Sequence, residues 1–473
     1  MATEKEEISM SKKILKNALP IVTKPEKEHL IVAAIDFGTT FTGYAFSTKK
    51  ILDDKINCSL FRSEGFQSEK APTCVLLNSD ETFSAFGYDA EEKYEELCLN
   101  NESDGYHYFE RFKMNLYKAK AEIRDDDIKL ALEPEAASLY CNMQKLCKIV
   151  KFDGKVELDS FPVGHRYIVA DLGGGTADLA VHEILDDQNL REIARSDGDA
   201  YGDAFEACSV SYNDTVREAN AKYTGKAEIK RDMFKFSADI MKCFFDKAVD
   251  GIVKFIKELR SNDELSMIHT ILMVGGFSES KYVQERIKND IRGVRLVIPI
   301  DPSLAVLKGA VLYGKNPQAI TERMARYSYG FSVARSFKEE TDPEELKITI
   351  NGMQYCKKVF KKLITKGEVL KKGEVFGNIM GHTVETNTVL SFMLSSLLPA
   401  VAKVYKSTKE DPKYTTTEEE CEELGKLIIH PPPSGWPPVS VLIQGLIVGD
   451  SEMHSFACNV KTKQIYAAKF DCL

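Results

Sequence analysis

The sequence contains two related copies of a short glycine-containing motif, and this repeat constrains the fold more than any other feature. Residues 35–40 read Ile-Asp-Phe-Gly-Thr-Thr, and residues 170–178 read Ala-Asp-Leu-Gly-Gly-Gly-Thr-Ala-Asp. Each copy follows an apolar run typical of a β-strand, and a second alternating stretch comes after it. Strand, glycine turn and strand predict a β-hairpin, and two such hairpins predict a duplicated fold.

Glycine turns of this kind are suited to binding phosphate. Without side chains in the way, backbone N–H groups can approach phosphate oxygens. The aspartates at the strand ends, Asp36 and Asp171, can then hold a hydrated Mg²⁺ that faces the same phosphates. The alternative is that both aspartates only cap their turns. The leading hypothesis is a nucleoside triphosphate bound between two related lobes.

Size and composition suit a soluble globular protein. The chain has 473 residues, enough for two or three domains, of which 43% are hydrophobic and 29% charged. A net charge of −9 leaves no basic excess for binding nucleic acid. The N-terminal stretch does not resemble a signal peptide. The best membrane candidate, residues 389–402, is too short to span a bilayer, so we expect no membrane span.

The cysteines and histidines give no metal-binding pattern. The eleven cysteines lack a Cys-x-x-Cys spacing, and we expect reduced thiols and a cytoplasmic location. Five of the eight histidines form no ligand spacing either, and core or surface positions are expected for these five: His165, His182, His269, His382 and His454.

The pattern along the chain predicts an α/β fold in four parts. Residues 1–29 are expected to form a disordered, solvated tail. Residues 30–150 would form a first lobe and residues 151–317 a second lobe, in which strands alternate with helices. Residues 318–473 show alternating strands and turns, which predict a β-rich C-terminal domain.

Individual elements can be placed by their hydrophobic periods. Helices are expected over residues 88–99, 128–150, 202–219, 230–259, 279–291 and 304–313. Strands outside the hairpins are expected over residues 71–77, 83–86, 270–274, 294–298, 346–350, 440–448, 455–460 and 464–470.

The two halves differ in one respect. After its hairpin, the second half continues with a parallel strand and long helices. The first half has only residues 106–127 in the corresponding stretch, and these are mostly charged. We therefore expect the first lobe to be shortened near residues 114–128, without a central strand and its crossover helix.

Several sequence motifs resemble those of a known family. They occupy residues 34–40, 109–114, 131–138, 171–178, 274–280 and 307–314. In this order they resemble the heat shock 70 kDa protein family of the actin-like ATPase superfamily, nearest to its divergent member-12 branch. The resemblance covers about residues 30–473 and weakens after residue 380. It implies a two-lobed, actin-like (ribonuclease H-like) nucleotide-binding domain, followed by a domain that looks like a reduced substrate-binding module.

The resemblance also implies roles for individual residues. Asp36 and Asp171 would lie near the hydrated magnesium. Lys113 would reach the transferring phosphoryl group and Glu133 would help to position the attacking water, with Asp171 as a third catalytic residue. The nucleotide-binding residues would be Gly38, Thr39, Thr40, Gly173, Gly174, Gly175 and Thr176 at the phosphates, and Gly275 and Gly276 at the adenine and ribose. Such parts suit phosphoryl transfer to water.

Some of these positions also have a structural interpretation. Glu133 precedes Pro134 at an expected helix start, where the helix dipole alone favours an acidic residue. Lys113 can be a solvated lysine among other basic residues. The chain departs from ordinary family members at Glu279, where they have an arginine that stacks on the base, and at Leu132, where they have asparagine. The member-12 branch shows similar changes.

Three functions follow as hypotheses. The first is an ATP-binding, chaperone-like protein and weak ATP hydrolase, with ATP/ADP and Mg²⁺ as cofactors and unfolded client proteins, peptides and co-chaperones as partners. The second is a non-hydrolysing, nucleotide-dependent adaptor or signalling scaffold. The third, a small-molecule kinase, is least favoured because no sugar-binding insertion is evident.

Overall fold

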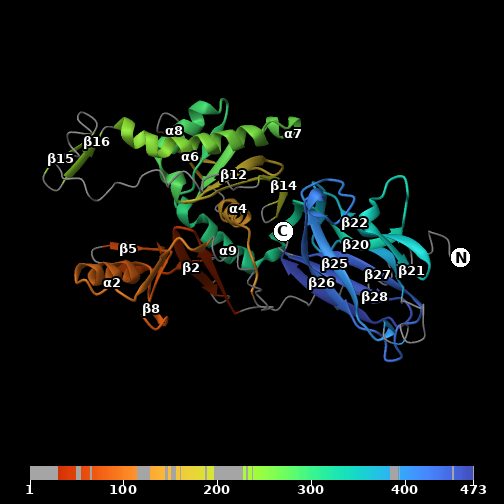
Figure 1. Ribbon diagram of the computed structural model, residues 1–473. Helices are drawn as coiled ribbons and strands as arrows, with labels where there is room; N and C mark the ends of the chain where they lie inside the picture. Colours follow the sequence, from red (N-terminus) through yellow and green to blue (C-terminus); the bar gives the residue numbers. More distant parts are fainter. Residues whose placement is uncertain are drawn as a thin grey trace. The chain divides into compact units, whose positions relative to one another are not determined.

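The computed structural model divides the chain into two compact units, one spanning His29–Ile320 and the other running on from Thr321. It describes residues 30–48, 55–63, 66–113, 128–143, 147–150, 156–159, 161–186, 189–196, 227–230, 233–236, 238–383, 393, 395–449 and 452–471. Both units contain several sheets, and the long helices that the structure describes belong to the first (Figure 1). In these ranges no helix is both long and apolar enough to cross a membrane.

The first glycine phrase forms a β-hairpin, as predicted. Strand β1 (Ile31–Phe37) pairs antiparallel with β2 (Phe41–Thr48), and the register places Asp36 opposite Gly43. Two short strands, β3 (Asn57–Cys58) and β6 (Ala71–Pro72), also pair with β2 and complete a four-stranded sheet.

The second phrase forms the same hairpin in a larger sheet. Strand β12 (Arg166–Leu172) pairs antiparallel with β13 (Ala177–Ile184), with Asp171 opposite Asp178. On its other side β12 pairs in parallel with β17 (Thr270–Val274). With β18 (Arg295–Val297) and β14 (Leu190–Ser196), five strands follow the order β18-β17-β12-β13-β14.

Helices cover both faces of the larger sheet. Ile168 and Ala170 pack in one cluster with apolar side chains of α6 (Ala238–Leu259) and α8 (Lys281–Asp290). Tyr167 and Val169, which alternate with them, pack with α4 (Glu133–Met143) and α9 (Ala305–Lys315). Burial on both faces explains why β12 and β17 are almost continuously apolar.

Helix α9 also packs against the smaller sheet. Leu307 and Val311 lie against Ala45 and Val32 on one face of the β1–β2 hairpin. Helix α9 touches α4 closely, since a Cβ at Gly309 would overlap the backbone carbonyl of Ala136. The pair α4 and α9 therefore packs next to both hairpin sheets.

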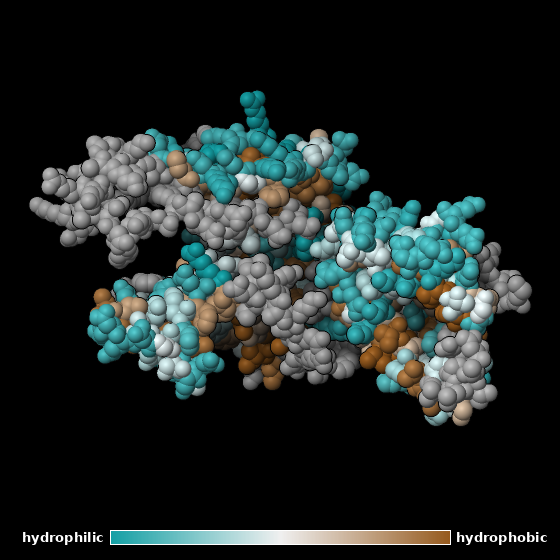
Figure 2. Space-filling view, viewed as in Figure 1, coloured by the Kyte–Doolittle hydropathy of each residue, from teal (hydrophilic) through white to brown (hydrophobic). Residues whose placement is uncertain are grey.

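The smaller sheet is less complete than the larger one. Among the described residues β1 pairs with β2 alone, whereas the equivalent strand β12 is flanked on both sides. The face away from α9 carries Ile31 (60% exposed), Ile35 (74%), Tyr44 (47%) and Phe46 (39%). A hydrophobic surface is visible at this place in Figure 2. The expected shortening near residues 114–128 lies almost entirely outside the described residues and stays a prediction.

The remaining elements of this unit are small. A three-stranded sheet of β7 (Cys74–Leu77), β8 (Phe83–Phe86) and β9 (His107–Glu110) packs with α2 (Tyr88–Leu99). Two-stranded pairs are β4 (Phe61–Ser63) with β5 (Phe66–Ser68), β10 (Cys147–Val150) with β11 (Val156–Asp159), and β15 (Ala227–Lys230) with β16 (Met233–Phe236). Short helical turns are α7 (Asp263–Ser266), η1 (Gly276–Glu279), η2 (Pro302–Leu304) and η3 (Pro317–Ala319).

The C-terminal unit is β-rich, as the period-two pattern predicted. One sheet follows the order β21-β22-β20-β25-β26 and another β24-β27-β28-β29, with a shared apolar core that includes Trp436. The bounds are β19 (Ile320–Met324), β20 (Ser328–Ser336), β21 (Lys347–Ile350), β22 (Met353–Ile364), β23 (Val369–Lys371), β24 (Val375–Thr383), β25 (Ala400–Ser407), β26 (Cys421–Ile429), β27 (Val439–Val448), β28 (Glu452–Asn459), β29 (Ile465–Asp471), η4 (Glu344–Leu346) and η5 (Thr417–Glu419).

Two expected helices are wrong in extent. The helix expected over residues 128–150 covers only Glu133–Met143, and Cys147–Val150 is a strand paired with β11. The helix expected over residues 230–259 begins at Ala238, because β15 and β16 form a hairpin before it. The helix expected over residues 202–219 lies outside the described residues.

Candidate functional site

One cavity of about 1150 Å³ in the His29–Ile320 unit brings together every site residue that the sequence analysis proposed. It is lined by Asp36, Gly38, Thr39, Thr40, Lys113, Glu133, Asp171, Gly173, Gly174, Gly175, Thr176, Gly275 and Gly276, together with further residues. Ligand pockets commonly measure about 300–1,000 Å³, so this cavity is slightly larger than most of them and has room for a nucleotide-sized molecule.

The first glycine turn is fixed by hydrogen bonds at its base. The Gly38 N–H donates to the Phe41 carbonyl at 3.1 Å and closes the β1–β2 turn. Thr73, just after β6, donates its hydroxyl to the Gly38 carbonyl at 2.7 Å and its N–H to the Thr40 carbonyl at 2.8 Å. These bonds hold the backbone of the turn in a defined shape at the cavity wall.

The second turn closes in the same way. The Gly173 N–H donates to the Thr176 carbonyl at 2.9 Å, at the end of the β12–β13 hairpin. Both hairpins have an aspartate as the last residue but one of their first strand, Asp36 in β1 and Asp171 in β12. Each aspartate stands two residues before the glycine that starts the turn.

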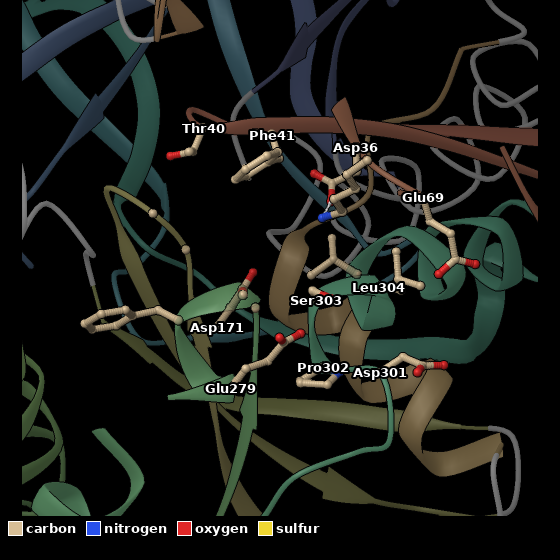
Figure 3. A pocket seen from close by; sticks show the side chains of 18 of the residues that line it. Asp36, Thr40, Phe41, Glu69, Asp171, Glu279, Asp301, Pro302, Ser303 and Leu304 are labelled. Carbon is tan, nitrogen blue, oxygen red and sulfur yellow. Dashed lines mark hydrogen bonds and ion pairs between the residues drawn. The ribbon is translucent and has the colours of Figure 1, made fainter. Parts of the chain in front are cut away.

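The two turns face one another. A Cβ added at Gly174 would overlap the Thr40 hydroxyl, and one at Gly175 would lie 3.6 Å from the Thr39 methyl group. Figure 3 shows Asp36 and Asp171 on opposite sides of the cavity, with the Asp171 carboxylate directed into the space between them. Related loops from the two hairpins thus enclose a common space.

The glycines after β17 form the third part of the wall. Gly275 has φ +82°, which favours glycine, and a Cβ there would overlap the Leu172 carbonyl. Its N–H donates to the Pro302 carbonyl at 2.9 Å. A Cβ at Gly276 would have open space around it, so the backbone at this position is accessible from the cavity that it lines.

Two of the three proposed catalytic side chains, Lys113 and Glu133, form an ion pair. Lys113 Nζ lies 3.2 Å from Glu133 Oε1, and about a third of each side chain is exposed. Glu133 is the first residue of α4, where its charge also suits the helix dipole. The aromatic ring of Phe112 packs on Phe37 at 5.8 Å between centroids, which keeps Lys113 next to the end of β1.

Asp171 lies in an unusual electrostatic environment. Burial raises the pKa of its carboxyl well above the ordinary value, and the negative charges of Glu133, Asp178 and Asp36 raise it further. The ammonium group of Lys70 acts in the opposite direction. A cation at this place would favour the charged form of Asp171, as expected for a residue that faces a metal.

Sequence reasoning missed several residues that line the cavity. Lys70 donates to Asp36 with Nζ–Oδ2 at 2.6 Å. Gln284, also in the lining, donates to the Ser278 carbonyl at 2.7 Å. Glu279, which the sequence analysis had already named, lines the same cavity and lies between Asp171 and Pro302 in Figure 3. The segment after β18 contributes a further wall: Ile298, Pro299, Ile300, Asp301, Pro302, Ser303 and Leu304. Pro299 and Pro302 mark this segment as a loop in the sequence. The sequence did not indicate that the loop lines the cavity.

The donor set has the chemistry that Mg²⁺ prefers, since carboxylate oxygens are hard ligands. In the part of the chain that the structure describes, no group of three or more His, Cys, Asp or Glu residues could hold a metal ion directly. The assignment of Asp36 and Asp171 to a hydrated magnesium ion stays a prediction. His182 is a core residue whose Nδ1 lies 2.6 Å from the Ser138 hydroxyl.

Comparison with known proteins gives distant matches, while no protein-family model matches the chain. Human heat shock 70 kDa protein 12A is 22% identical over 535 residues, covering 74% of this chain and 79% of the relative. The mouse protein of the same name is 22% identical, over 76% and 80%. Human heat shock 70 kDa protein 12B is 24% identical, over 75% and 79%.

These alignments are longer than the chain itself, so they include stretches of the relatives with no counterpart here. The resemblance inferred from the motifs is confirmed: over about three quarters of its length, the chain is distantly similar to heat shock 70 kDa proteins 12A and 12B.

Proposed function

We propose that the chain is an ATP-binding protein of the heat shock 70 kDa type, built on a two-lobed, actin-like nucleotide-binding domain. One observation carries the proposal: two glycine turns with the same hairpin geometry face each other across a single cavity. The triphosphate would lie between the turns, with their backbone N–H groups toward the phosphate oxygens.

Each half of the cavity would have its own part in binding. Asp36 and Asp171 would hold a hydrated Mg²⁺, which neutralises phosphate charge when bound. Gly275 and Gly276 would let the backbone approach the adenosine. Because one nucleotide would contact residues from both hairpins, it would bind a closed arrangement of the lobes better than an open one.

The proposal also includes chaperone activity, in which the C-terminal unit binds client peptides. Exposed apolar side chains on the C-terminal unit support peptide binding: Ile379 is 40% exposed, Val441 46% and Val439 62%. The β24–β27 register puts these three side chains on one face of their sheet. An extended apolar segment of a client protein would bind such a face, and co-chaperones would regulate the exchange of nucleotide. We place these activities in the cytoplasm.

The Lys113–Glu133 ion pair favours a second candidate, a nucleotide-dependent adaptor without hydrolysis. In this arrangement Glu133, which is proposed to position the attacking water, is paired with Lys113, which is proposed to reach the phosphoryl group. Hydrolysis would require ATP to separate them, whereas nucleotide binding alone would not.

The experiment is a calorimetric titration of the purified protein with ATP and magnesium, followed by an assay of phosphate release. Binding with steady release that rises with unfolded peptide supports the chaperone. Binding without release supports the adaptor. Absence of any adenine-nucleotide binding overturns both candidates.

A further inference from the structure

Negatively charged side chains outnumber positively charged ones among the described residues of the cavity wall. Among the described residues its lining includes six carboxylates, Asp36, Glu69, Glu133, Asp171, Glu279 and Asp301, and two lysines, Lys70 and Lys113. A triphosphate adds further negative charge to this space. Opposite charge close to the phosphates is therefore needed for binding, whether a metal ion or a side chain supplies it.

Lys70 and Lys113 differ in how they are placed. The Lys113–Glu133 pair is open to solvent, with 33% and 35% of the side chains exposed, so water weakens its field. The Lys70–Asp36 pair is shorter, at 2.6 Å, and largely buried, with 19% and 9% exposed. Lys70 is thus the less exposed of the two cavity lysines, and water screens its charge less.

The sheet provides a path for the Lys70 side chain. Lys70 directly precedes β6, which pairs with β2 through Thr42 and Ala71. The residue opposite Asp36 in the hairpin register is Gly43. A Cβ at Gly43 would lie only 3.0 Å from the Lys70 Cγ, so the absence of a side chain there leaves room for the lysine stem.

This route ends at the phosphate side of the cavity. Asp36 is two residues from Gly38, which opens the first glycine turn. The Lys70 ammonium also acts across the cavity, since it opposes the neighbouring carboxylates that disfavour charge on Asp171. One ammonium group therefore interacts with both aspartates that the proposed function assigns to magnesium.

We propose that Lys70 is a phosphate-positioning residue: its ammonium, anchored by Asp36, is a built-in counter-ion for the triphosphate. The inference rests on the proposed nucleotide binding and adds a residue and a property to it. Lys70 stays bound to Asp36 while it donates a further hydrogen bond to a phosphate oxygen, because an ammonium group has three donors. Part of the cationic charge at the site is then permanent, and nucleotide binding depends only weakly on magnesium.

The test measures affinity for a non-hydrolysable ATP analogue by calorimetry, with magnesium and with EDTA, in full-length protein. The wild type is compared with Lys70→Met, Lys70→Arg and the double variant Asp36→Asn/Lys70→Met. Lys93→Met is the matched control, since Lys93 lies on α2, outside the cavity, and contacts Ser84. Thermal unfolding of each variant checks that it is folded.

For the wild type we expect EDTA to weaken binding by less than about tenfold. Lys70→Met should weaken magnesium-free binding by at least about tenfold, the loss of a charged hydrogen bond, and bind markedly better when magnesium is added. Lys70→Arg should keep most magnesium-free affinity, since its charge remains. The double variant should bind better than Lys70→Met without magnesium, because it no longer has an uncompensated carboxylate.

The outcomes separate this inference from the proposed function. If the wild type and Lys70→Met both bind and show the same dependence on magnesium, the role of Lys70 is overturned and nucleotide binding stands. The same holds if Lys93→Met behaves like Lys70→Met. If the wild type binds no nucleotide in either condition, both ideas fail together.

Discussion

Thr40 of the first glycine turn packs against Gly174 of the second so closely that any side chain at 174 would overlap its hydroxyl. The two residues are 134 positions apart and belong to hairpins with matching register. This contact is the most direct structural sign that the repeated phrase forms one site rather than two.

Replacement of Gly174 by alanine should therefore open the cavity at its phosphate end. The added Cβ must push the turns apart, and overpacking of this kind costs about 1–3 kcal/mol. We expect at least a tenfold loss of ATP affinity by calorimetry. Gly381→Ala is the control, because a Cβ there meets nothing within 4 Å. Unchanged affinity in Gly174→Ala would show that the turns do not contact the nucleotide together.

Gly275→Ala should lower the free energy of unfolding more than Gly293→Ala does. Both glycines have positive φ, +82° and +74°, which disfavours alanine at either position. The ψ of +160° also places Gly275 in a backbone region that is open essentially to glycine alone. Only at Gly275 would the Cβ also overlap a backbone carbonyl, that of Leu172. Urea denaturation of the two variants measures the difference. Equal losses would mean that the strand ends next to the cavity have room to move.

Glu133→Gln tests whether the cavity hydrolyses ATP. If Glu133 positions the attacking water, phosphate release should fall by about 100-fold or more, with ATP affinity nearly unchanged. Glu95→Gln, an exposed position on α2, is the control. A variant that releases phosphate at the wild-type rate would leave Glu133 with a helix-capping role, and a wild type without release would favour the adaptor.

Asp171→Asn should stabilise the nucleotide-free protein, with an effect that grows with pH. The folded state raises the pKa of Asp171 above its unfolded value of about 3.9. In the window between these two pKa values the folded state binds more protons, so wild-type stability falls as pH rises. Asparagine does not titrate and escapes this loss.

Urea denaturation at pH 5 and pH 8 measures the effect of Asp171→Asn. Asp239→Asn is a suitable control because Asp239 is 88% exposed on α6. Equal stability of Asp171→Asn and wild type at both pH values would contradict the unfavourable electrostatic environment. The same variant should lose the benefit that magnesium gives to ATP binding.

The site could be predicted from sequence where it depends on local pattern. Each glycine turn is a contiguous strand, turn and strand, so Asp36 and Asp171 could be assigned to equivalent positions in two hairpins. Lys70 could not be found in this way. Its contact with Asp36 spans 34 residues and depends on the pairing of β6 with β2. Strand β6 has only two residues, Ala71 and Pro72, so it has no recognisable pattern in the sequence.

The secondary structure, too, could be predicted from sequence where it depends on local pattern and could not where it depends on distant pairing. Helix α2 and strands β8 and β17 have the expected bounds because their periods are clear over the whole segment. The expected helix over residues 128–150 is too long, since Cys147–Val150 pairs with β11 and tertiary pairing overrides local helix propensity. The exposed face of β1 and β2 has no signal in sequence, because alternation does not tell which face another element covers.

The most direct test of the central claim is amide hydrogen exchange of the full chain with and without ATP and magnesium. The account predicts slower exchange in both glycine turns, at residues 38–40 and at residues 173–176, because one triphosphate binds both sets of N–H groups. Protection confined to one turn, or to neither, would contradict a nucleotide held between the two hairpins.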